Sequence, residues 1–116
     1  VAMYYERLDV WKRSFQLSLL VYRSFYLLKD FSLKDQMCRC SVSIPSNIAE
    51  GYERFSKKER AHFLSIAKGS VGELKTQVML AFELGYLHKE NYLLITNECE
   101  EIGKMLGKLM YLHKNN

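Results

Sequence analysis

The chain has 116 residues, of which 48% are hydrophobic and 26% are charged, with one proline and six glycines. This composition excludes a disordered chain and a turn-rich β architecture, and the length suits a single globular domain over residues 1–116, with 1–7 as an irregular N-terminal segment. Seventeen Lys and Arg against thirteen Asp and Glu give a net charge of +4, which weakly favours a polyanionic partner.

The first half of the chain predicts two helices. The first spans about 8–29, and its expected inner face has spacings of three and four: Leu8, Trp11, Phe15, Ser18, Tyr22 and Phe25. Residues 17–28 are apolar on nearly every side, which predicts that a partner subunit covers this helix. The second helix spans about 33–53, with an inner face of Met37, Cys40, Ile44, Ile48 and Tyr52. Pro45 in its middle predicts a kink or a restart.

The second half predicts two longer helices. Ser56 and Glu59 have the spacing of a capping box, and Gly85 suits a helix C-terminus, so the third helix lies between them. Its heptad seam is Leu64, Ala67, Val71, Leu74, Val78 and Ala81. The fourth helix ends near residue 112 and has the seam Tyr92, Ile95, Cys99, Ile102, Leu106 and Leu109. The fold class is therefore all-α, an antiparallel up-down four-helix bundle with its second helix kinked near Pro45.

Enzyme chemistry has little support in the sequence. Glu59 and His62 form one Glu-x-x-His pair, but carboxylate-bridged di-metal bundles need two, and Glu59 is better explained as a capping residue. Cys38 and Cys40 lie two positions apart on a helix and point to nearly opposite sides, so we expect packing residues. No phosphate-binding glycine loop or nucleophile elbow is present. We predict no enzyme, no metal and no cofactor.

The basic residues suggest a nucleic-acid surface. The candidates gather mainly around the turn between the second and third helices: Arg39, Arg54, Lys57, Lys58, Arg60 and Lys68. Tyr52 and Phe55 lie beside them and suit base stacking. The alternative is a solvated helix start, partly balanced by Glu53 and Glu59.

The expected location is the cytoplasm. Three cysteines, Cys38, Cys40 and Cys99, make no disulfide framework, and residues 1–13 lack the apolar core of a signal peptide. No apolar run reaches the roughly 18 residues that a transmembrane helix needs, so we expect no membrane partner.

Polar residues run through the second helix around Pro45, and a second polar stripe follows the third helix at Ser70, Glu73 and Gln77. We expect the first stripe to serve the backbone at the proline, and the two stripes to face each other or a neighbouring subunit.

The string from Gln36 to Gly51, with Ser-Ile-Pro-Ser-Asn-Ile-Ala-Glu-Gly at its end, closely resembles one bacterial family. These are the four-helix-bundle proteins encoded in intervening sequences of large-subunit ribosomal RNA genes, which are related to the accessory proteins of diversity-generating retroelements. The likeness runs from Leu8 to the last helix. The residues that match the family pattern are Arg39, Ser43, Pro45, Asn47, Glu50, Gly51, Arg54, Gly69, Ser70 and Glu73.

This resemblance implies a homopentameric barrel of bundles, no enzymatic activity, and a basic surface that engages RNA, DNA or a nucleoprotein. Five copies at +4 would carry +20, which strengthens polyanion binding. Cys38 stands where the family often has a second arginine, so a contact that depends on that arginine is in doubt. The matching residues serve either a ligand or the subunit interface. The leading hypothesis is a non-catalytic oligomeric scaffold that binds RNA or a nucleoprotein, and the alternative is a structural or protein-binding oligomer.

Overall fold

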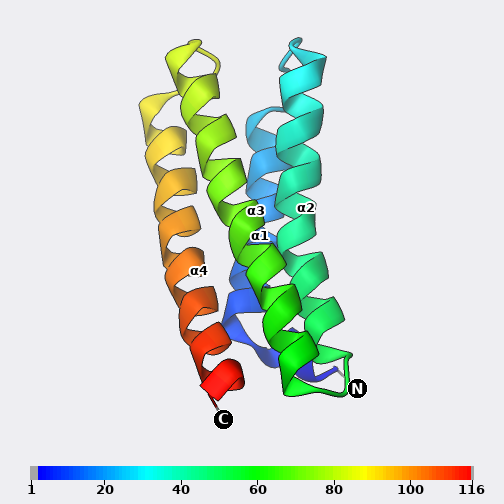
Figure 1. The fold of residues 1–116 in the computed structure, drawn as a ribbon. Helices are drawn as coiled ribbons and strands as arrows, with labels where there is room; N and C mark the ends of the chain where they lie inside the picture. The colour runs from blue at the N-terminus through cyan, green and yellow to red at the C-terminus, as the bar shows by residue number, and fades with distance from the viewer. Residues whose placement is uncertain (1–2, 116) are drawn as a thin grey trace.

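The computed structural model describes residues 3–115, and these form four α-helices and one short 3₁₀ turn, with no strand among them. The helices are α1 (Asp9–Ser24), α2 (Phe31–Tyr52), α3 (Lys57–Glu83) and α4 (Lys89–Asn115). They run alternately up and down, so the start of α1, the α2–α3 turn and the end of α4 lie at the same end of the bundle (Figure 1). Each helix contacts its two neighbours in the ring order α1, α2, α3, α4. The all-α four-helix prediction is confirmed.

The N-terminal residues differ slightly from expectation. Residues 1 and 2 of the segment expected to be irregular lie outside the described part of the chain. Tyr4–Arg7 form the 3₁₀ turn η1. The backbone N–H of Met3, the residue before it, donates to Glu6 Oε1 at 3.1 Å. The segment therefore packs as a turn against α1 and α2.

Local hydrogen bonds set the helix ends. Asp30 Oδ1 accepts from the backbone N–H of Leu33 at 3.1 Å, so Asp30 caps α2 and the helix begins two residues earlier than expected. Ser56 Oγ accepts from Glu59 N at 3.0 Å, which confirms the Ser56 half of the predicted capping box. Gly85 has φ of +78°, and the N–H of Tyr86 reaches the carbonyl of Ala81 at 2.9 Å, which closes α3 with a Schellman motif.

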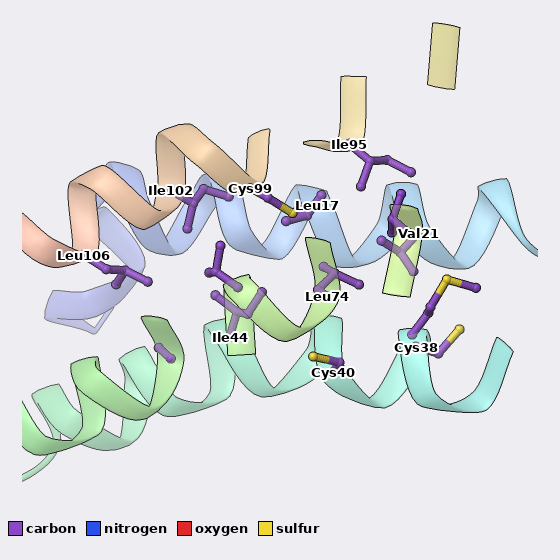
Figure 2. Close-up of a cluster of buried hydrophobic side chains, with 14 of the residues drawn as sticks. Leu17, Val21, Cys38, Cys40, Ile44, Leu74, Ile95, Cys99, Ile102 and Leu106 are labelled. Carbon is purple, nitrogen blue, oxygen red and sulfur yellow. The ribbon is translucent and has the colours of Figure 1, made fainter. Parts of the chain in front are cut away.

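The core comes from one stripe on each helix, and the side chains of all four stripes point toward one another (Figure 2). The predicted α3 seam is buried throughout, and the α4 seam is buried at Ile95, Cys99, Ile102 and Leu106. The α2 face is buried at Met37, Cys40, Ile44 and Ile48, and both cysteines of this helix are packing residues, as predicted. These three seams are confirmed.

The predicted inner face of α1 is wrong at Phe15 and Tyr22, although Phe25 is buried and Leu8 and Trp11 pack partly buried against the core. The buried residues are Val10, Ser14, Leu17, Val21 and Phe25, whereas the side chains of Phe15 and Tyr22 are 43% and 48% exposed. Both sets have helical spacing and lie one residue apart on the same side of the helix, so spacing alone does not choose between them. The helix also ends at Ser24 rather than near 29. The next residue, Phe25, is buried in the core, and the chain then crosses to α2.

Phe15 and Tyr22 instead border a hollow between α1 and α2. The hollow has a volume of about 480 Å³, and Trp11, Val42 and Pro45 also line it. Its lining is almost entirely apolar. The excess apolar surface that the sequence indicated on the first helix is therefore real and lies on the outside of the bundle.

α2 passes through Pro45 without a break, so the expected restart does not occur, and the bend stays a prediction. Pro45 has no N–H to offer the carbonyl of Ser41 four residues earlier. Ser18 Oγ of α1 donates to that carbonyl at 2.8 Å. Ser43 Oγ donates to the Cys40 carbonyl at 2.6 Å, and Asn47 Nδ2 to the Ser43 carbonyl at 2.8 Å. Polar side chains thus serve the backbone around the proline, as predicted.

None of the helices between residues 3 and 115 is both long enough and apolar enough to cross a membrane.

Candidate nucleic-acid interface

Arg54 and Arg60 contact side chains of their own chain near the α2–α3 turn. Arg54 pairs with Glu50 at 2.5 Å and lies 4.8 Å from the centre of the Phe63 ring. Arg60 lies 4.6 Å from the centre of the Tyr52 ring and is partly buried. Tyr52, which we expected to stack on bases, is therefore covered on one face. Phe55 remains fully exposed beside the turn.

Lys57 and Lys58 open onto a hollow between the start of α3 and the end of α4. This hollow has a volume of about 1010 Å³, and its other polar lining includes His62, His113 and Lys114. α4 runs antiparallel to α3, so its last turns lie beside the first turns of α3 (Figure 1). The fold therefore adds C-terminal cations to the two lysines that the sequence singled out.

Lys68 lies two to three turns further along α3, beside a second hollow of about 340 Å³. Lys104 of α4 lines the same hollow, and Glu100 closes its far end, where it pairs with Lys75 at 2.8 Å. Gly107 lines both hollows, so they meet there. We call the joined hollows the α3–α4 groove.

Glycines make part of the floor of this groove. Gly72, Gly103 and Gly107 all lie inside helices, where a glycine costs about 0.5–1 kcal/mol relative to alanine. A Cβ at Gly72 would meet nothing within 4 Å, and one at Gly103 would make an ordinary contact of 3.7 Å with Val71. At Gly107 a Cβ would come within 3.3 Å of Lys68 Cε, so the Lys68 stem lies across this glycine.

Arg39 lies apart from this groove, on the outer side of α2. Its side chain is 81% exposed and pairs with Asp35 at 2.9 Å. An exposed i,i+4 ion pair contributes little to stability, so the fold does not require it. The structure thus brings Lys57, Lys58 and Lys68 together and leaves Arg39 separate.

His113 connects the groove to the α2–α3 turn. Its Nε2 lies 3.0 Å from the Tyr52 hydroxyl, and the two rings meet edge to face. Burial, then the nearby charges of Arg60 and Lys57, lower the pKa of His113 from its usual value. The imidazole is therefore mostly neutral at pH 7, and the lysines carry the charge of the groove.

The polar stripe on α3 reaches α2 at Cys40, which lies on the buried inner face of α2. Its thiol donates to the Ser70 carbonyl at 3.1 Å and to Glu73 Oε1 at 3.2 Å. Burial, then the Glu73 carboxylate, raises the pKa of Cys40 to about 12. Gln77 Oε1 is buried with no hydrogen-bond partner among the described residues. That the two stripes face each other or a neighbouring subunit stays a prediction.

Two glycines of the family pattern have different surroundings. A Cβ at Gly51 would lie 3.1 Å from Phe63 Cβ and 3.2 Å from the Arg60 carbonyl, so α2 and α3 approach closely only because residue 51 is glycine. A Cβ at Gly69 would meet nothing within 4 Å. Packing inside the chain therefore explains why residue 51 is glycine. It does not explain the glycine at position 69, which is exposed on α3.

No metal centre is visible in the described part of the chain. Among residues 3–115, no group of three or more His, Cys, Asp or Glu is placed to hold a metal ion. Glu59 lies exposed in the first turn of α3, whose cap it completes through its backbone N–H.

Comparison with known proteins decides the family. The model of the 23S rRNA-intervening sequence protein family matches residues 6–108. The chain belongs to this family. A solved structure from Bacteroides thetaiotaomicron VPI-5482, described as a protein with unknown function from the S23 ribosomal protein family, shares 26% identity with a TM-score of 0.82. The alignment covers 87% of this chain and 97% of that one. None of the curated proteins matches the chain.

The sequence alone did not predict that Lys104, His113 and Lys114 lie near the α3 lysines. A signal was available, since Lys104, Lys108 and Lys114 all fall in the second half of the fourth helix. An antiparallel bundle must place that part of α4 beside the start of α3.

Proposed function

We propose that this chain is a non-catalytic oligomeric scaffold that binds RNA or a nucleoprotein partner through the basic surface of α3 and α4. The observation that carries the proposal is the α3–α4 groove, where Lys57, Lys58 and Lys68 face Lys104 and Lys114. Five lysines on one face give a larger local charge than the net +4 suggests. The family is named for an rRNA intervening sequence, which is consistent with a nucleic-acid partner.

Assembly is the second part of the proposal, with a homopentamer as the expected state. The apolar hollow between α1 and α2 exposes Phe15 and Tyr22, which favours a partner subunit at this surface. The bend that Pro45 favours in α2 belongs to the same proposal, because Pro45 lines this hollow. Exposed Gly69 also supports close approach by another chain.

Binding is tested by fluorescence anisotropy with a labelled mixed-sequence RNA at 50 and 200 mM salt. The triple variant K57A/K58A/K68A should lose most of the affinity at low salt, and wild-type affinity should fall steeply with salt. The matched control K12A/K29A/K89A removes the same charge from elsewhere. No binding at low salt, or equal binding by the two triple variants, would refute this surface.

Assembly is tested by native mass spectrometry, where the main species should have five times the protomer mass. The substitution Y22S in the apolar hollow should shift the population to smaller species, whereas L94S, at a 51% exposed leucine of α4, should not. A monomeric wild-type protein would refute this part. An intact oligomer that binds no RNA would favour the structural alternative.

A further inference from the structure

We infer that the α3–α4 groove holds the backbone of one nucleic-acid strand rather than the surface of a duplex. This inference rests on the proposed function and specifies its ligand. The groove lies between two adjacent helices, whose axes in packed bundles are about 8–10 Å apart. Helices at this distance are in contact, so only a narrow depression runs between them; a single phosphate backbone can lie along it, whereas a duplex can only rest on the ridges beside it.

The lysines form two rows that follow such a strand. Lys57, Lys58 and Lys68 lie on the α3 side, and Lys104 and Lys114 on the α4 side. Lys68 lies eleven positions after Lys57, which corresponds to about 16 Å along α3. The five lysines offer about five contacts to the phosphates of one strand.

The glycine floor supports close approach by the ligand. Gly72 and Gly103 have room for a Cβ, so packing within the chain does not require glycine there. Both line the groove, where a missing side chain leaves space for a phosphate backbone. Gly107 has a different effect, because it lets the Lys68 stem cross the floor and present its ammonium group to the groove.

The wider end of the groove offers rings for stacking. Tyr111 is 68% exposed and lines it together with His62. Proteins that bind single strands combine a basic channel with exposed aromatic rings, because every base has a face that can stack. A duplex keeps its bases stacked on one another and gains nothing from these rings.

The experiment compares a labelled 20-nucleotide RNA without self-complementarity with the same RNA paired to its complement. The single strand should bind at least tenfold more tightly at 50 mM salt. Its affinity should fall with salt with a logarithmic slope of about −3.5, from five contacts at about 0.7 each. The variant K68A/K104A should weaken single-strand binding at least tenfold, whereas K12A/K89A should leave it nearly unchanged.

Two further variants guard against a folding defect. G107A keeps α4 helical but displaces the Lys68 tip, so it should weaken single-strand binding severalfold with an unchanged circular dichroism spectrum. Y111L should weaken it about tenfold.

The outcomes separate the two proposals. Equal binding of duplex and single strand, or normal binding by K68A/K104A, overturns the single-strand inference while the basic-surface proposal stands through Lys57 and Lys58. Failure of both probes to bind at 50 mM salt overturns both.

Discussion

The hydrogen bond from Ser18 to the Ser41 carbonyl makes a sharp test of how the fold tolerates a proline inside α2. Ser18 Oγ lies 2.8 Å from this carbonyl, and Ser41 is fully buried. S18A leaves the carbonyl without its donor, which should cost about 1–3 kcal/mol of the free energy of unfolding. In P45A, residue 45 regains an N–H that can reach the same carbonyl. S18A should therefore lower the free energy of unfolding of P45A by about 1–2 kcal/mol less than that of the wild type.

The assay is urea unfolding followed by circular dichroism at one protein concentration, because assembly makes stability depend on concentration. The double-mutant cycle cancels the higher helix propensity of alanine over serine, since both backgrounds gain it equally. S14A is the matched control: Ser14 is buried one turn earlier, and its Oγ donates to the Trp11 carbonyl at 2.9 Å. A cost of S18A that is the same with and without Pro45 would refute the proposed role of Ser18.

Three further predictions follow from local geometry. G51A should destabilise the protein by about 1–3 kcal/mol in urea unfolding, because its Cβ would crowd Phe63 Cβ and the Arg60 carbonyl. G69A should instead stabilise an isolated protomer by about 0.5–1 kcal/mol and reduce the oligomer fraction in native mass spectrometry; an unchanged fraction would remove Gly69 from the interface. Burial raises the pKa of Cys99 to about 12, so the folded state holds this proton more tightly and stability should fall as pH rises above about 9. By pH 10 this loss should be about 1.4 kcal/mol, and C99A should reduce the loss by that amount; equal pH dependence in both proteins would contradict this reasoning.

The sequence predicted most of the fold because the apolar residues of α2, α3 and α4 recur in steps of three and four along one line of each helix. The α3 seam from Leu64 to Ala81 is buried throughout, as its spacing indicated. The face of α1 could not be predicted in the same way, because Val10–Ser14–Leu17–Val21 and Trp11–Phe15–Ser18–Tyr22 have the same spacing. Only the packing partners from α2 and α4 decide which set lies inside.

The candidate interface was partly predictable for a related reason. Lys57 and Lys58 are close in sequence, so their charge was visible as a cluster. Lys104 and Lys114 join them only through the antiparallel pairing of α3 with α4, more than 45 positions away in sequence. The engagement of Arg54 by Phe63 and of Arg60 by Tyr52 depends equally on tertiary contacts. Spacing rules alone cannot give such contacts.

The ring order of the helices makes assembly and polyanion binding compatible. α1 and α2 border the apolar hollow, and α3 and α4 border the lysine groove. Each helix contacts only its two neighbours in the ring, so these two pairs lie on opposite sides of the bundle. A subunit seated on the apolar hollow would therefore leave the groove of the same protomer open. In a closed oligomer the grooves would repeat around the assembly, and a strand that spans two of them would bind far more tightly than one groove allows, because the second contact is intramolecular.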